Sequence, residues 1–121
     1  MYSLFMADRS LRTLREPTFF ILASLLDGPL HGYGIVGRAA ELSDGRIKLT
    51  AGTLYGALDR LAGDGVVELA GDEVVEGRLR RLYRLTSAGV DLVADEARWM
   101  REAAAVVDNR LAKARLRTVR A

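Results

Sequence analysis

Residues 50–61 read TAGTLYGALDRL, and the apolar residues in this stretch recur with the period of an α-helix. Leu54, Leu58 and Leu61 stand at positions i, i+4 and i+7, so a helix would gather them into one buried stripe. Thr50 precedes them and has the hydroxyl that can bond a free amide of the first helical turn. The stretch therefore predicts a short amphipathic helix capped by Thr50.

The opposite side of this helix has almost no long side chain. It carries Gly52, Thr53, Gly56, Arg60 and Gly63. Each glycine costs helix stability, so a helix selected only for solubility would carry Glu or Lys at these positions. A bare face suits a helix that lies close against another surface, and the DNA major groove is wide enough to admit a helix. The alternative is a weak surface helix with flexible positions.

Two further helices are predicted upstream. Residues 17–27 form a buried helix that starts at Pro17 and stops at Gly28-Pro29. A tight connection over residues 30–32 then leads into a second helix, which ends at Leu42.

Short strands complete the pattern. Residues 46–49 alternate in polarity and are enough for one small strand, while residues 66–69 and 82–85 are strand-like runs on either side of a polar segment. Helix, helix, strand, helix and hairpin is the order of a winged helix-turn-helix, whose recognition helix enters the major groove. We expect a mainly α protein with a small β-hairpin.

The second half of the hairpin is rich in arginine, with Arg78, Arg80, Arg81 and Arg84 inside seven residues. Arginine near a hairpin tip can pair with phosphate oxygens and release counterions, which gives affinity without sequence choice. The first half carries acids that could instead neutralise these arginines, namely Glu68, Asp72, Glu73 and Glu76. Because side chains alternate along a strand, Arg78 and Arg80 share one face and Arg81 lies on the other, so both uses stay open.

The last helix is predicted to begin at a cap formed by Thr86-Ser87, to run to about residue 117 and to have two apolar stripes. The first has coiled-coil spacing and comprises Val93, Ala97, Met100, Ala104, Val107, Leu111 and Ala114. The second comprises Leu92, Trp99, Ala103 and Val106. Such a helix cannot bury both faces against a small winged domain, so we expect one face to pack on the domain and the other on a second copy of the chain.

Composition narrows the class of protein. The 121 residues carry a formal net charge of +2 and no cysteine, which predicts one domain without disulfide or thiolate chemistry. His31 is the single histidine, so one chain can build neither a Ser-His-Asp relay nor a multi-histidine metal site. We expect His31 to bond nearby backbone at a helix start. Residues 32–37 match G-x-G-x-x-G, but Asp27-Gly28-Pro29 interrupts the chain before the first glycine, and no parallel βαβ unit fits in the remaining length. We expect no enzyme, no cofactor and no metal.

Targeting signals are also missing from the sequence. No apolar run reaches the length of a membrane span, and residues 1–5 are too short for a secretory signal, so a cytoplasmic location is expected. From residue 110 onward the chain holds five bases and no acid. A tail of this kind is most often solvated, although it can touch nucleic acid.

The motifs together resemble the PadR family of bacterial transcriptional regulators, in particular its short members. The resemblance spans residues 17–92 and rests on His31-Gly32-Tyr33, Gly52-Thr53-Leu54-Tyr55, Gly77-Arg78 and Tyr83-Arg84-Leu85-Thr86, together with Leu58, Leu61 and Gly89. The chain departs from the family pattern at Ala51 and Gly56, where proline is usual, and at Asp59, where a basic residue is frequent. The resemblance implies dimerisation through the last helix.

These observations predict an N-terminal extension over residues 1–16, a winged helix-turn-helix DNA-binding domain over residues 17–86, and a dimerisation helix with a basic tail over residues 87–121. We expect a repressor that binds double-stranded DNA at an inverted repeat as a homodimer. Contact with DNA is expected from Tyr33, Lys48, Thr50, Gly52, Thr53, Tyr55, Gly56, Arg60, Arg78, Arg80 and Arg81. Contact between subunits is expected from Val93, Ala97, Met100, Ala104, Val107 and Leu111.

Three points stay open at this level. Tyr33 could pack in the core instead of contacting phosphate. Trp99 either covers contacts between subunits or, as the resemblance implies for some short family members, lines a pocket for a small planar aromatic effector. Asp59 and the low net charge favour an alternative function, a small-molecule-sensing or protein-interaction module that has kept the fold without specific DNA binding.

Overall fold

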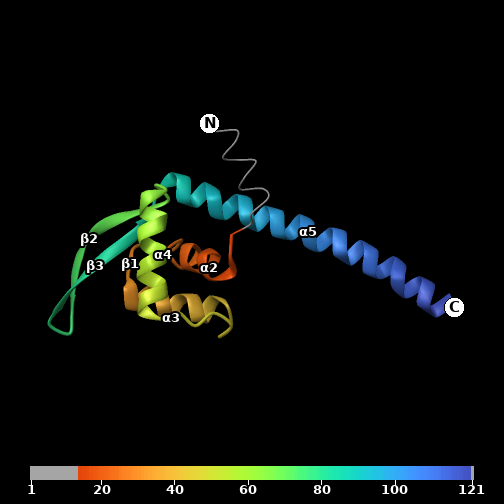
Figure 1. The fold of residues 1–121 in the computed structure, drawn as a ribbon, viewed down its shortest axis with the longest axis horizontal. Coiled ribbons are helices and arrows are strands. Elements are labelled where there is room, and N and C mark those ends of the chain that lie inside the picture. The colour runs from red at the N-terminus through yellow and green to blue at the C-terminus, as the bar shows by residue number, and fades with distance from the viewer. Residues whose placement is uncertain (1–13, 121) are drawn as a thin grey trace.

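The structure is a computed structural model that describes residues 14–120. Its elements are α2 (Glu16–Ser24), β1 (Leu30–His31), α3 (Gly32–Leu42), α4 (Ala51–Gly63), β2 (Val67–Val75), β3 (Arg78–Leu85) and α5 (Ser87–Arg120). The first three of these helices pack together beside a small sheet, and α5 extends far beyond them (Figure 1). Most of the predicted N-terminal extension, residues 1–13, lies outside the described residues.

Side-chain caps start α3 and α4 as the sequence predicts. The Thr50 hydroxyl accepts a hydrogen bond from the Thr53 amide at 3.2 Å. The Nδ1 atom of His31 accepts one from the Gly34 amide at 3.3 Å, so the single histidine caps a helix. Each cap satisfies an amide that has no partner inside its helix, and this fixes where the helix begins.

Helix α2 ends earlier than predicted. Pro17 lies in its first turn, but the helix stops at Ser24, and residues 25–27 form a turn that leads to Gly28. The φ angle of Gly28 is +140°, a conformation that other residues rarely adopt. The chain therefore leaves α2 before the glycine and turns towards β1.

The sheet is antiparallel and has the strand order β1-β3-β2. Its main part is the β2–β3 hairpin, which is much longer than the two four-residue runs that the sequence predicts. The strands continue to a two-residue turn at Glu76-Gly77, where both φ angles are positive, +51° and +77°. Such a turn follows the twist of a hairpin. Ala70-Gly71 is not a loop but an irregularity between the pairs of Leu69 and Asp72.

One predicted strand is wrong and one strand was not predicted. Residues 46–49 form no strand: the Ile47 amide donates to the Ser43 hydroxyl at 2.9 Å, and the Ile47 side chain is buried beneath an irregular loop. The third strand is instead β1, which the sequence presents as a tight connection. Leu30 pairs with Tyr83 and His31 pairs with Leu82.

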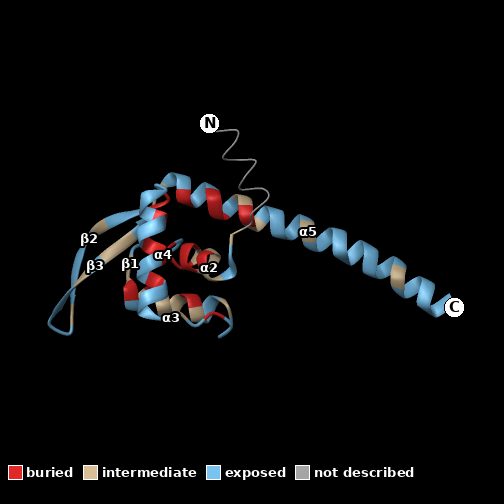
Figure 2. Ribbon diagram, in the orientation of Figure 1, coloured by how far each residue is buried: buried red, intermediate tan, exposed pale blue. Residues whose placement is uncertain are grey.

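The leucine stripe of α4 lies at the centre of the core, as predicted. Leu54, Leu58 and Leu61 are 1%, 1% and 5% exposed. They pack with Ile21 and Leu22 of α2, and with residues from α3, β2 and the start of α5. Buried residues accordingly lie on the inner faces of α2, α3 and α4 and on the first part of α5 (Figure 2).

Helix α5 starts on the domain and then leaves it. The Thr86 hydroxyl accepts from the Gly89 amide at 3.1 Å and caps the helix. Leu92 and Val93 both lie in the core of their own chain, so Val93 is not available to a second subunit and its assignment to the subunit interface is wrong. The first residue of each apolar stripe, Leu92 and Val93, is buried against the domain. The large apolar residues further along both stripes are exposed.

Two helical glycines differ in a way that predicts opposite effects of the same substitution. A Cβ at Gly89 would overlap the carbonyl oxygen of Val66, whereas a Cβ at Gly56 would meet nothing within 4 Å. In α4, Gly56→Ala should raise the free energy of unfolding by about 0.5–1 kcal/mol because alanine favours the helix. In α5, Gly89→Ala should lower it by about 1–3 kcal/mol because backbone must move. Urea unfolding at a fixed protein concentration measures both, and two changes of the same sign would contradict this geometry.

Candidate nucleic-acid interface

The exposed face of α4 is flat and nearly free of side chains. Gly52, Thr53, Gly56, Arg60 and Gly63 are all exposed, and a Cβ at Gly52 or Gly56 would meet open space. The buried leucine stripe determines this, because it fixes the rotation of α4 about its axis. The face offers the hydroxyl of Thr53, the guanidinium of Arg60 and exposed backbone to whatever lies against it.

The start of α3 and strand β3 of the hairpin meet at a stacked pair. The guanidinium carbon of Arg80 lies 5.0 Å from the ring centroid of Tyr33, within the range of a cation–π interaction. The Nε atom of Arg80 is buried, and residues 14–120 offer it no hydrogen-bond partner. Tyr33 itself is 71% exposed, so it is not a core residue. The stack thus ties the hairpin to α3 and leaves the tyrosine hydroxyl at the surface.

An open cavity of about 320 Å³ lies beside this stack. It is lined by Gly32, Tyr33, Val36, Leu49, Ala51, Leu54, Tyr55 and Arg80. The phenol of Tyr55 lies against the backbone of Gly32, where any Cβ would overlap its hydroxyl. The glycine therefore lets the Tyr55 ring lie against the start of α3, and a larger residue there would displace the ring.

Few of the hairpin arginines are neutralised by the facing acids. Arg84 forms an ion pair with Glu68 at 2.8 Å. Arg80 faces Glu73 and Arg81 faces Asp72 across the strands, yet within residues 14–120 neither of these arginines, nor Arg78, forms an ion pair. Glu68 therefore neutralises Arg84 near the root of the hairpin, while the three arginines nearer its tip form no ion pair within residues 14–120.

The phenol of Tyr83 lies between α4 and the hairpin. Its pKa is raised chiefly by burial, and the charge of Tyr55 raises it further, Arg81 lowers it and Asp59 raises it. Tyr83 therefore stays protonated at neutral pH. Because Asp59 and Arg81 act on the same phenol, the negative charge of Asp59 is felt at the hairpin as well as on α4.

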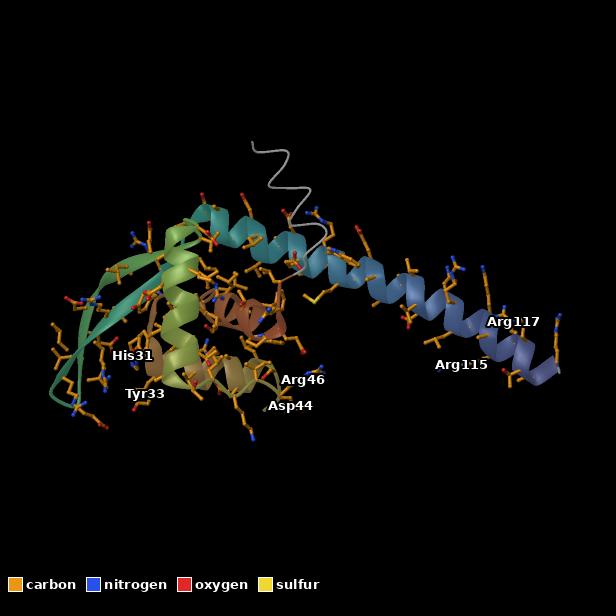
Figure 3. All side chains as sticks on the ribbon, viewed as in Figure 1. His31, Tyr33, Asp44, Arg46, Arg115 and Arg117 are labelled. Carbon is orange, nitrogen blue, oxygen red and sulfur yellow. The ribbon has the colours of Figure 1, made fainter. Side chains whose placement is uncertain are left out.

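The remaining predicted residues surround these features. Lys48 and Thr50 are exposed on the loop before α4, and Tyr55 is 44% exposed beside the cavity. Figure 3 shows Tyr33 at the start of α3, whereas Arg115 and Arg117 lie at the far end of α5, away from the hairpin. The basic tail is thus separate from the surface formed by α4 and the hairpin.

Helix α5 carries a second candidate surface. Met100, Val107 and Leu111 are 45%, 54% and 42% exposed, and Ala104 is also exposed, while Ala97 is half-buried. Trp99 is 40% exposed and borders a shallow hollow lined by Trp99, Glu102, Ala103, Val106 and Val107. Clustered exposed apolar side chains are typical of surfaces that contact another molecule.

The sequence did not predict the contact between Arg80 of the hairpin and Tyr33 of α3. Arg80 and Tyr33 are each predicted to contact DNA, but nothing in their spacing indicates that they contact one another. Within the described range, no group of three or more His, Cys, Asp or Glu residues could hold a metal ion. No helix in that range is long and apolar enough to cross a membrane.

Known proteins resemble this chain in sequence and in fold. The transcriptional regulator Rv3488 of Mycobacterium tuberculosis is 37% identical over 84 residues, which are 69% of this chain and 75% of Rv3488. A PadR family transcription regulator from Clostridium difficile R20291 has a similar structure, with a TM-score of 0.66 and 24% identity over 80% of this chain and 99% of that one.

Bacillus subtilis PadR, solved in complex with operator DNA, has a TM-score of 0.58 and 23% identity over 67% of this chain and 46% of that one. At these identities the two structures establish the winged-helix fold with its long last helix. The pattern of the transcriptional regulator PadR-like family matches residues 21–95, which are more than half of the chain. From the capped helices, the bare face of α4, the long hairpin and this match, we conclude that the chain belongs to the PadR-like family of transcriptional regulators.

Proposed function

We propose that this regulator binds double-stranded DNA through the exposed face of α4, with the hairpin acting as a wing on the adjacent phosphate backbone. The observation that carries the proposal is the bare face of α4 beside three arginines that form no ion pair within the described residues. Glycines let backbone approach the groove closely, and Thr53 and Arg60 can bond base edges. Tyr33, Lys48, Thr50 and Tyr55 border this face and can bond phosphates.

We further propose a homodimer that recognises an inverted repeat and represses transcription there. The exposed residues Met100, Ala104, Val107 and Leu111 of α5, with the half-buried Ala97, would meet their symmetry-related copies. Two recognition helices would then enter successive major grooves. The operator DNA held by Bacillus subtilis PadR supports this use of the fold, and a protein that occupies an operator blocks access to it. Such a protein works in the cytoplasm.

Trp99 is the proposed contact for a small planar aromatic effector. Its ring borders the shallow hollow on α5, at a place where a second subunit would close the open side. Indole rings stack on flat molecules. A ligand bound there would release the repressor if it altered how the two subunits pack.

An interaction module without specific DNA binding is the second candidate function. It is favoured by Asp59, which is exposed on α4 where a basic residue would suit DNA better. Retention on DNA at increasing salt separates the two functions. A regulator loses affinity steeply as salt rises, because bound phosphates release counterions, whereas an interaction module shows no specific retention at any salt.

Selection of bound fragments from a random DNA pool tests the proposed function most directly. Fragments that share a palindrome support a dimeric, sequence-specific regulator. Retained fragments without a common sequence would contradict specific recognition, and an absence of retention would favour the interaction module.

The wing arginines should differ in their effects on binding. Arg78→Ala should weaken binding to operator and to random duplex about equally, and should reduce the slope of log affinity against log salt by about two units per dimer, because phosphate contacts carry no sequence information. Arg80→Ala should weaken binding more, since it also removes the stack on Tyr33 that ties the wing to α3. Salt titrations by fluorescence anisotropy measure both. A loss confined to the operator would mean that the wing reads bases.

Gly56→Leu tests the face of α4. The added side chain meets open space, so the folded state should be kept. Affinity for DNA should nevertheless fall by about tenfold or more, because a leucine there holds the helix away from the groove floor. Gly37→Leu is the matched control, since this glycine is also helical and open but lies on α3. Equal affinities of the two variants would show that the groove does not approach Gly56.

Carboxylates on α5 test the proposed dimer. In Met100→Glu and Leu111→Glu, dimerisation would bury charges that have no partner, at a cost of several kcal/mol, so the protomers should separate. Operator binding should be lost with the dimer although no DNA-contacting residue has changed. Analytical ultracentrifugation and anisotropy on the same samples report both properties. A variant that stays dimeric and still binds a palindrome would remove these residues from the interface.

A further inference from the structure

Helix α5 is attached to its own domain by a short patch only. Gly89, Leu92, Val93 and Glu96 are buried, while beyond Ala97 every side chain up to residue 120 is exposed apart from the half-buried Ala103 and Ala114. Figure 2 shows the same pattern, with buried residues confined to the first part of the helix. The direction in which the long arm leaves the domain is therefore set within about two turns of helix.

Glu96 is the last buried residue of this patch and an unusual one. It is 4% exposed, and it is the one charged residue between positions 14 and 120 that is buried. A buried carboxyl group costs free energy unless polar partners satisfy it. Its Oε2 atom lies 3.4 Å from the Leu14 amide, which donates to it from just before α2.

The position of this contact links two elements. Leu14 packs against the core and precedes α2, whose N-cap residue Arg15 makes no side-chain cap. A carboxylate near the start of a helix is favoured by the free amides and the dipole at that end. Glu96 thus joins α5 to the entry of α2 by a directional bond, next to the apolar contacts of Leu92 and Val93.

Apolar contacts and a directional bond constrain a helix differently. Leucine and valine packing tolerates small rotations, because the hydrophobic effect has no preferred direction. A buried polar group keeps its partner in only one geometry, and such groups are known to select one arrangement among several at a cost in stability. The patch therefore combines the apolar contacts of Leu92 and Val93 with one directional bond to Glu96.

The length of the arm makes this angle matter. From Glu96 to Leu111 the helix rises about 22 Å, so a rotation of about 9° at the anchor moves the dimerisation surface by about 3.4 Å, the axial spacing of one base pair. We propose, building on the dimeric operator binding proposed above, that Glu96 is a positioning residue that sets the angle between α5 and the winged domain and thereby selects the spacing between operator half-sites.

Two substitutions at Glu96 separate positioning from packing. Glu96→Leu keeps the bulk and removes the acceptor, so the fold and the dimer should be retained, since apolar residues can replace buried polar ones without loss of stability. Glu96→Gln keeps a carbonyl oxygen for the Leu14 amide and should behave like the wild type. Asp91→Leu is the control, because it removes an acid from an exposed position on the same helix.

The first measurement uses operators with the selected half-sites and a spacer lengthened or shortened by one or two base pairs. The wild type and Glu96→Gln should prefer one spacer by about tenfold, whereas Glu96→Leu should bind neighbouring spacers within about twofold of one another or prefer a different one. A Glu96→Leu dimer that keeps the wild-type preference would overturn the role of Glu96. If the wild type binds the operator as a dimer but ignores the spacer, spacing selection fails while dimeric operator binding stands, whereas a wild type that binds no spacer variant contradicts the dimeric operator binding itself.

The second measurement does not involve DNA. The chain has no cysteine, so Ala62→Cys on α4 and Arg115→Cys on α5 can carry spin labels at two exposed sites. Labelled protein mixed with excess unlabelled protein reports the distance within one chain. In Glu96→Leu this distance should shift or broaden by about 4 Å, the displacement that a 9° rotation gives at residue 115. An unchanged distribution would show that Leu92 and Val93 alone set the angle, whatever the protein does on DNA.

Discussion

The burial of the α4 leucine stripe is the constraint on which the other features depend. Leu54, Leu58 and Leu61 face α2, β2 and the start of α5, and this contact leaves α4 only one rotation about its axis. With that rotation set, the glycines of α4 face outward and Tyr55 lies against Gly32. A helix with a weaker stripe could turn, and the bare face would then no longer lie beside the hairpin. The packing of the leucine stripe thus determines which residues of α4 are exposed.

The hairpin is attached to the helices by strand pairing and by a cation–π contact. The root half of β3 pairs with β1, and nearer the tip Arg80 stacks on Tyr33. Towards its tip it projects with arginines that make no ion pair within the described residues. A wing attached rigidly at one end and charged at the other can approach a duplex without rearranging the helices. In the proposed complex its arginines would add affinity, whereas the face of α4 would supply the choice of sequence.

The third feature, α5, joins the winged domain to whatever it assembles with. Its first turns belong to the core, and its remaining length presents Trp99, Met100, Val107 and Leu111 to solvent. A small change in the angle at which α5 leaves the domain therefore moves the far end of the helix by several ångströms, because the displacement grows with the length of the helix. If the proposed dimer binds DNA, the anchor at Leu92, Val93 and Glu96 would affect recognition as much as the residues proposed to contact DNA.

The sequence by itself determined the helices, their caps and the face of α4, because these follow from local spacing and from side chains that bond neighbouring amides. Thr50, His31 and Thr86 cap helices as predicted, and the stripe at residues 54, 58 and 61 is buried. The length of the hairpin and the absence of a strand at residues 46–49 depended on hydrogen bonds that local pattern does not reveal, such as that between Ser43 and Ile47. Only the tertiary structure brought Arg80 onto Tyr33, placed Val93 in the core and buried Glu96 beside Leu14, because these contacts join segments far apart in the chain. Long-range contacts of this kind depend on how packed elements are oriented, and periodicity within one element does not encode that orientation.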